Sequence, residues 1–272
     1  MEMTVAGCRE RATGLLRVAG IAGLATLVGC QPAVAAPQTA EERAAARVIV
    51  KERASAVVVV LATIKVRLNV SGREQTSDQT AQTNATVLDP SGLAVMSLQQ
   101  IQPDEAMTRM YSRQVPGGGR VEVTTDIADM RMHLADGREV PAKLVLRDED
   151  LDLAFVRPTE PLSAPLPFVD ATSARPQLLD ALTLVRRTGE PTAWAPAAAF
   201  ATVELVIDKP RTYYQVVILG GGGPGCPLFD AAGHFVGVLV MRDTGTRGTG
   251  ALGVLPADDI RDVAKQAPPK EP

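Results

Sequence analysis

The sequence predicts an all-β protein built of two antiparallel β-barrels and ending in a short helix. From residue 54 onward, short apolar runs rich in β-branched residues are separated by turn signals, which is typical of strands joined by hairpins. The segment 158–167 has four prolines in ten residues and cannot lie inside a sheet, so we interpret it as a linker. Many short strands on each side of one linker favour two barrels.

The first barrel is expected over residues 54–157. Its long first strand, Ala54–Val70, is rich in β-branched residues, and Asp89-Pro90-Ser91-Gly92 is a favourable turn sequence. Polar and apolar residues alternate in the segment before Asp136-Gly137, which predicts a half-buried strand and then a hairpin turn. The strands expected here are 54–70, 85–88, 93–98, 130–134, 140–146 and 152–157.

The second barrel and the C-terminal helix are expected over residues 168–266, followed by a tail at 267–272. Asp230-Ala231-Ala232-Gly233 predicts the turn of a hairpin. Pro256, together with Asp258 and Asp259, suits the first turn of a helix. The strands expected here are 181–187, 199–207, 213–219, 227–229, 234–241 and 251–255.

The first 29 residues have the pattern of a signal peptide. Arg9, Arg11 and Arg17 precede an apolar run at 18–28, which is too short to span a bilayer as a stable helix. The run ends in Leu27-Val28-Gly29-Cys30, which resembles the lipobox of bacterial lipoproteins, where cleavage before the cysteine is followed by its acylation. Ordinary secretion, with cleavage after the Ala-Val-Ala-Ala run at 33–36, is the alternative. Residues 30–53 are expected to be a tether leading into a short helix at 40–53.

Composition and charge argue against several classes of function. The net charge is −3 and no basic patch is evident, so we expect no nucleic-acid binding. The three cysteines, Cys8, Cys30 and Cys226, form no disulfide framework, and with only two histidines we expect no metal site and no cofactor.

Four motifs in the same order resemble the HtrA/Deg branch of the trypsin-like serine proteases, over about residues 48–266. The strongest motif consists of the hairpin 134–143 followed by Asp152-Leu153-Ala154. In this resemblance, Asp152 matches the acid of the family's catalytic triad. The other three motifs are, in chain order, the turn 88–93, the hairpin 227–237 and the final segment 253–256. The resemblance implies the chymotrypsin/trypsin-like double antiparallel β-barrel.

The sequence departs from this family at the two positions that perform the chemistry. Gln99 stands where the family has the catalytic His, and no His occurs anywhere between 54 and 132. Pro224 stands where the family has the nucleophilic Ser, in Gly222-Gly223-Pro224, the equivalent of the oxyanion loop. Because Gln cannot act as a base and Pro has neither a nucleophile nor an N–H, we expect none of these three positions, Asp152 included, to function in catalysis.

Cys226 is the one candidate for a replacement nucleophile. If Phe229 and His234 flank the hairpin turn, Cys226 is expected to pair near Gly237, roughly 10 Å from His234 at about 3.3 Å per residue. We therefore interpret Cys226 as a small buried residue, and His133 and His234 as surface residues.

These observations predict an inactive protease homologue with a binding or scaffold role, in which the cleft holds a peptide or protein ligand. The alternatives are an active HtrA-like endopeptidase with a rearranged site and a structural envelope lipoprotein without a ligand. The lipobox predicts export and attachment to a bacterial membrane on its periplasmic side through Cys30, and Gln31 favours the outer membrane. The ligand and the oligomeric state are not predicted.

Overall fold

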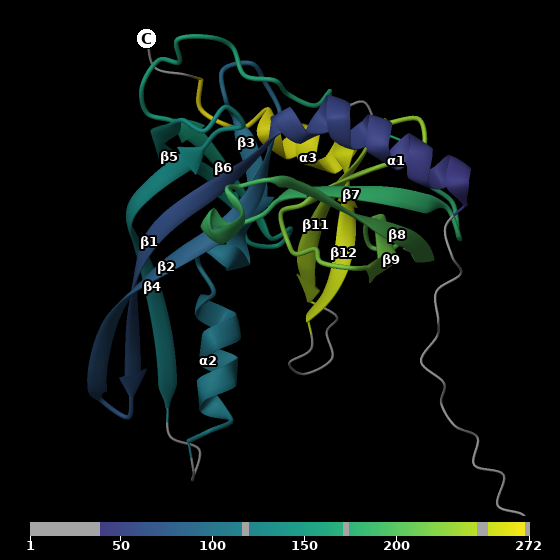
Figure 1. The fold of residues 1–272 in the computed structure, drawn as a ribbon. Helices are drawn as coiled ribbons and strands as arrows, with labels where there is room; N and C mark the ends of the chain where they lie inside the picture. Colours follow the sequence, from purple (N-terminus) through teal and green to yellow (C-terminus); the bar gives the residue numbers. More distant parts are fainter. Residues whose placement is uncertain (1–38, 116–119, 171–173, 244–249, 270–272) are drawn as a thin grey trace, which may run out of the picture. The chain divides into compact units, whose positions relative to one another are not determined.

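The computed structural model describes residues 39–115, 120–170, 174–243 and 250–269, which form two six-stranded antiparallel barrels (Figure 1). The all-β fold class predicted from the sequence is therefore confirmed. The first barrel has the strand order β1-β2-β3-β6-β5-β4, and the second has the order β10-β11-β12-β9-β8-β7. The signal segment and Cys30 lie outside the described residues.

The first barrel contains six strands and one inserted helix. Its strands are β1 Val57–Val70, β2 Arg73–Val87, β3 Ala94–Ser97, β4 Val121–His133, β5 Glu139–Asp148 and β6 Leu153–Pro158. A 3₁₀ turn, η2 Leu98–Gln100, and the helix α2 Asp104–Ser112 follow β3. The turn predicted at 89–92 is present, since the Ser91 N–H donates to Asp89 Oδ1 and the Gly92 N–H to Asp89 O.

The second barrel contains the remaining strands and is followed by the C-terminal helix. The strands are β7 Ala181–Arg187, β8 Pro196–Ile207, β9 Tyr213–Leu219, β10 Pro227–Phe229, β11 Phe235–Asp243 and β12 Gly250–Pro256. A 3₁₀ turn, η3 Glu190–Thr192, joins β7 to β8, and α3 Ala257–Ala264 follows β12. As predicted, the helix begins directly after Pro256, with Asp258 and Asp259 in its first turn.

The helix α1 Ala40–Arg53 lies where the sequence predicts it. Thr39 caps its N-terminus: the Glu42 N–H donates to Thr39 Oγ1, and the Thr39 N–H donates back to Glu42 Oε2. Such a capping box satisfies two N–H groups that the first helical turn leaves free. The predicted strand start at Ala54 is wrong, because residues 54–56 form a 3₁₀ turn, η1, and β1 begins at Val57.

Several strands are buried on both faces because the two barrels pack against each other. In β6, Ala154 and Val156 belong to the core inside the first barrel. Leu153 and Phe155 point the other way, into a second cluster that also contains Phe229 from the second barrel. Successive strand residues alternate in direction, so one short strand serves both cores. This packing explains why 153–156 is a continuous apolar run.

Arg187, at the end of β7, joins the two barrels with polar contacts. Its Nε donates to Val57 O at 2.6 Å, its Nη2 to Ala54 O at 2.9 Å and its Nη1 to Trp194 O at 3.1 Å. Its backbone N–H also donates to Asn84 Oδ1 in β2. Burial lowers the pKa of Arg187, but these carbonyl partners compensate for the loss of water around the guanidinium.

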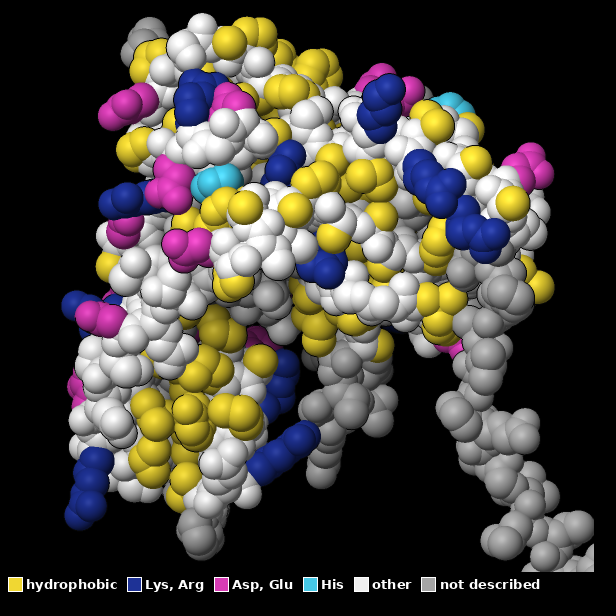
Figure 2. All heavy atoms as spheres, viewed as in Figure 1, with side chains coloured by type: hydrophobic (Ala, Val, Ile, Leu, Met, Phe, Trp, Pro, Cys, Tyr) yellow, Lys and Arg dark blue, Asp and Glu magenta, His cyan; other side chains and the backbone are white. Residues whose placement is uncertain are grey.

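A three-stranded extension projects beyond the first barrel. It consists of the distal parts of β2, β1 and β4, with α2 packed beside β4 (Figure 1). Hydrophobic side chains gather over this extension (Figure 2), and Leu68, Met107 and Tyr111 there pack against the first core. The sequence interpretation missed α2, the polar part of β2 and the first half of β4.

Replacing Arg187 with Met is expected to lower the free energy of unfolding by about 3 kcal/mol, because it leaves buried carbonyl groups without donors. Urea unfolding of the purified protein measures this. Arg186→Met is the matched control, since the Nε of Arg186 has no hydrogen-bond partner among the described residues. Equal losses in the two variants would contradict the role assigned to Arg187.

Candidate functional site

The buried carboxylate of Asp152 is the centre of the candidate site. Asp152 precedes β6, is 3% exposed and has a φ of 57°. This left-handed conformation is uncommon outside glycine, although Asp adopts it more readily than most residues. The Leu98 N–H donates to the carbonyl oxygen of Asp152 at 3.1 Å, which ties this turn to the segment after β3.

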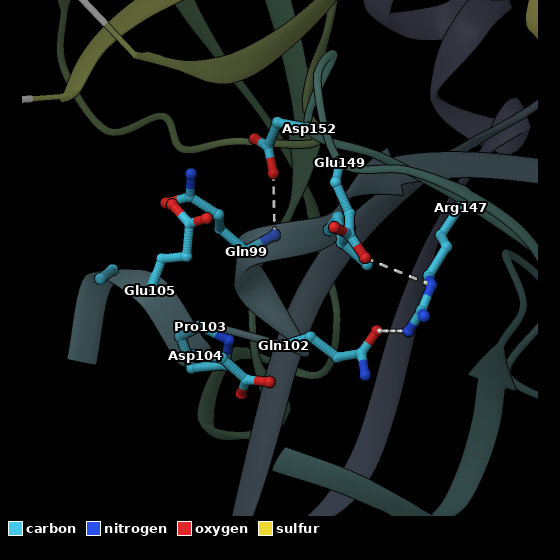
Figure 3. A pocket seen from close by; sticks show the side chains of 10 residues that line it. Gln99, Gln102, Pro103, Asp104, Glu105, Arg147, Glu149 and Asp152 are labelled. Carbon is cyan, nitrogen blue, oxygen red and sulfur yellow. Dashed lines mark hydrogen bonds and ion pairs between the residues drawn. The ribbon is translucent and has the colours of Figure 1, made fainter. Parts of the chain in front are cut away.

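Three donors from three segments converge on the Asp152 side chain. The Ser97 hydroxyl donates to Oδ2 at 2.6 Å, and the Met241 N–H of β11 donates to the same oxygen at 2.7 Å. The Gln99 N–H donates to Oδ1 at 2.8 Å (Figure 3). Burial nevertheless raises the pKa of Asp152 above its ordinary value, while these hydrogen bonds act in the opposite direction. The carboxylate therefore links the first barrel to the second.

Gln99 and Asp152, two of the positions that the sequence singles out, are thus in direct contact. Gln99 belongs to η2, the 3₁₀ turn that begins where β3 ends. Its backbone is bonded to Asp152, and its side chain lines a polar pocket of about 160 Å³. The same pocket is lined by the first turn of α2, by Gln102 and by the charged residues Arg147 and Glu149 (Figure 3).

Pro224 occupies a tight turn at the start of β10. The Cys226 N–H donates to Gly223 O at 3.2 Å, so Pro224 and Gly225 are the two central residues of the turn. Gly225 has a φ of +89°, and proline followed by a residue with positive φ is the pattern of a type II turn. A Cβ on Gly225 would lie 2.3 Å from Asn84 O, so glycine is required where this turn meets β2.

β11 connects the Pro224 turn to Asp152. The Gly225 N–H donates to Leu239 O at 2.6 Å, and the Leu239 N–H donates to Cys226 O at 2.9 Å. Met241, the donor to Asp152, is two residues further along β11, about 7 Å at the usual rise of a strand. Gln99, Asp152 and the loop Gly222-Gly223-Pro224 therefore belong to one region where the barrels meet.

Cys226 is buried, as predicted, at 2% exposure. Burial raises the pKa of its thiol to about 11, so little thiolate forms near neutral pH. The predicted pairing near Gly237 is wrong, since Cys226 pairs with Leu239. Phe229 pairs with Phe235 and not with His234, and a bulge between Leu228 and Phe229 shifts the register by one further residue. His234 is five residues before Leu239, the residue that pairs with Cys226, so it lies further from the thiol than predicted. Its imidazole contacts the carboxylate of Asp230.

The prediction that both histidines lie on the surface holds only for His234. His133 is 7% exposed and stacks on Trp194, with the ring centroids 4.5 Å apart. The sequence interpretation erred because β4 is half-exposed along most of its length, while its end reaches the second barrel. Ser97 and Met241 were also missed. The hydroxyl of Ser97, two residues before Gln99, was visible in the sequence, whereas a backbone donor such as Met241 carries no side-chain signal.

Within the described residues, no group of three or more His, Cys, Asp or Glu side chains is arranged to hold a metal ion. No helix there combines the length and the hydrophobicity needed to cross a bilayer.

Two antiparallel six-stranded barrels with a buried aspartate at their junction define the double-barrel class of trypsin-like serine peptidases. The chain belongs to the trypsin-like peptidase domain family, whose model matches residues 45–238. A search of curated proteins finds no match.

The fold is also similar to that of HtrA-type proteases of known structure. One is "HtrA-type protease AlgWS227A with decapeptide", with a TM-score of 0.55 and 17% identity over 81% of this chain and 66% of that chain. Another is "HtrA-type protease AlgWS227A with tripeptide", with a TM-score of 0.53 and 17% identity over 81% of this chain and 62% of that one. At this identity the likeness concerns the fold, and the chain spans less than two thirds of either solved chain.

The pKa of Asp152 gives a testable dependence of stability on pH. Because its pKa is raised in the folded state, the contribution of Asp152 to stability is full below its unfolded pKa and is lost as pH rises through the folded pKa. The unfolding free energy of the wild type minus that of Asp152→Asn should therefore fall as pH increases from about 3, by about 1.4 kcal/mol per unit of pKa difference. Urea unfolding between pH 3 and 7 measures it. A difference that grows with pH would mean that the three donors outweigh burial.

Proposed function

We propose that this protein is a catalytically inactive member of the trypsin-like peptidase family, which binds a peptide or protein segment and is held in the bacterial cell envelope by acylated Cys30. The observation that carries the proposal is the pair of residues at the positions of the nucleophile and the base. Pro224 occupies the first and Gln99 the second, at the junction where Asp152 lies.

Pro224 removes two parts of the acyl-transfer machinery at once. It has no nucleophilic side chain, and it has no backbone N–H to bind the developing oxyanion. In serine proteases, loss of the nucleophile costs about 10⁶ in rate, and loss of one oxyanion donor costs about 10² to 10³. Its place in the Gly223–Cys226 turn gives Pro224 a structural role that requires neither group.

Gln99 independently removes the general base. A carboxamide does not titrate near neutral pH and cannot accept the proton of a nucleophile. Asp152 therefore has no imidazole to orient. Its hydrogen bonds to Ser97, Gln99 and Met241 support a purely structural function for this carboxylate.

The pocket beside Asp152 supports a binding role. Its lining is rich in groups that can donate or accept hydrogen bonds, including Gln99, Gln102, Glu105, Arg147 and Glu149 (Figure 3). Arg147 contacts both Gln102 and Glu149, so its guanidinium lies among the other polar groups of the lining. Such a surface suits a polar peptide segment that is bound but not cleaved.

Restoring both missing side chains tests whether these two substitutions are what disables the site. A carboxylate has about four acceptor positions, and the three donors leave one free on Oδ1 of Asp152. An imidazole introduced by Gln99→His can therefore bond to Asp152. The double variant Gln99→His, Pro224→Ser is expected to react with a fluorophosphonate probe, whereas the wild type and both single variants should not.

Gel fluorescence after incubation with the probe measures this, with an Asp152→Asn version of the double variant as control. Specific labelling of the wild type would show that the natural protein is a hydrolase. An unlabelled double variant that keeps the wild-type circular dichroism spectrum would show that more than these two positions has changed.

Acylation of Cys30 is tested by Cys30→Ser. The variant should move from the detergent-extracted membrane fraction to the soluble fraction, since stable anchoring requires the acyl chains. Mass spectrometry of the N-terminal peptide identifies the modification. Membrane association that persists in the variant, or a mature N-terminus following residue 36, would contradict anchoring through Cys30.

A further inference from the structure

The extension has two outer edges, and along most of the β2 edge no other described residue pairs with the strand. Thr86 and Val87 pair with β3, and at Asn84 the side chain bonds to both the N–H and the carbonyl oxygen of Arg187. Gly189 lies against the side chain of Gln82. Beyond that point, from Arg73 to Ala81, β2 pairs with β1 on one side only, among the residues that the structure describes.

This open edge is long and regular. The nine residues cover about 30 Å at the rise of an antiparallel strand, and their pairing with β1 continues without a register shift. In such a strand, about half of the backbone N–H and C=O groups point away from the existing partner. Proteins usually protect an edge of this kind with proline, charged side chains, a bulge or a covering element. Residues 73–81 contain no proline and no bulge, and their charged side chains are Arg73, Glu74 and Asp78.

The opposite edge of the same extension is protected. α2 packs along β4 (Figure 1), and the Val123 N–H donates to Thr108 Oγ1 at 3.0 Å. The register of β4 against β1 also shifts next to Ile64. One sheet of three strands therefore has one edge that is covered and irregular and one edge that is straight and open.

The charges beside the open edge indicate what it would accept. Glu74 and Asp78 are exposed on one face of β2, four residues apart. On that face Asn69 lies opposite Glu74, and Lys65 lies between Asp78 and Asp126. Arg67, the other basic residue there, is bonded to Asp126. Lys65 thus faces two carboxylates, and Glu74 has an uncharged residue opposite it on β1. A basic residue on an added strand, directly opposite Glu74 or Asp78, would stabilise that strand pair.

We propose that the edge of β2 from Arg73 to Ala81 is a docking site for an extended polypeptide segment of another protein, which adds to the sheet as a further strand and places two basic residues, four positions apart, opposite Glu74 and Asp78. Backbone hydrogen bonds supply most of the affinity in this mode, and side-chain complementarity supplies register. The other face of the edge offers Gln75, Ser77 and Gln79, which suit hydroxyl or amide side chains.

This site does not depend on the state of the Asp152 region. Asp78 is eight residues from Thr86, the first residue of β2 that pairs with β3, and this corresponds to about 27 Å along the strand. Docking at the edge and the loss of catalysis can therefore be tested separately.

The test uses the full-length chain in detergent and the fluorescein-labelled peptide Thr-Thr-Lys-Thr-Thr-Thr-Lys-Thr-Thr. Fluorescence anisotropy at low salt should show saturable binding, weakened at least tenfold when both lysines of the peptide are replaced by Glu. The variant Glu74→Lys, Asp78→Lys should reverse this preference. Glu52→Lys, Glu160→Lys is the matched control, since it makes the same change in net charge at exposed residues elsewhere and should bind like the wild type.

Backbone methylation distinguishes strand addition from simple charge attraction. Two further peptides carry N-methyl groups on the odd-numbered or on the even-numbered residues, so each blocks one edge of the added strand. One of them should lose at least tenfold in affinity and the other should bind like the parent peptide. Equal binding of both, or equal effects of the two double variants, would overturn the proposal. A wild-type dimer that Glu74→Lys, Asp78→Lys dissociates, with no peptide binding, would replace it with a second copy as the occupant.

Discussion

The junction of the two barrels depends on one buried carboxylate. Asp152 receives hydrogen bonds from the end of β3, from η2 and from β11, so a single side chain sets the relative position of three segments from both barrels. Burying a charge is costly unless it is well bonded, and the three donors offset part of that cost, although burial still raises the pKa of Asp152. Asp152 therefore contributes to the structure of the junction whether or not the site around it is catalytic.

Arg187 and Gly225 act at the same junction. Arg187 donates to the carbonyl groups of the first residue of η1 and of the residue that follows η1, and Gly225 allows the Pro224 turn to approach the backbone of β2. Neither the side chain of Gln99 nor that of Pro224 takes part in these contacts. The architecture of the junction therefore does not depend on which side chains stand at positions 99 and 224.

The sequence predicted the features that have a local signal. The hairpin turns at Asp89, Asp136 and Asp230 contain residues with strong turn preferences, and the strands 181–187, 213–219 and 227–229 are found with the predicted bounds. The distal part of β2 was missed because it is exposed on both faces and shows no alternation. The first half of β4 and α2 were missed although signals existed, namely the alternation of Val121 and Val123 with polar residues and the acidic start of α2 after Pro103.

At the candidate site, Gln99, Asp152 and Pro224 could be predicted as a set because each lies in a recognisable motif. What could not be predicted is how Asp152 is satisfied, since two of its donors are backbone groups and one comes from the other barrel. The burial of His133 could not be predicted from the sequence either, because Trp194, on which its ring stacks, is sixty-one residues away along the chain.

The stack of His133 on Trp194 has a practical consequence. Trp194 is the only tryptophan in the chain, and the imidazole against it belongs to the other barrel. The tryptophan fluorescence of this protein consequently originates at the junction of the two barrels, next to a ring that can quench it. The emission of Trp194 therefore reports, without an added dye, whether the two barrels are in contact at this place.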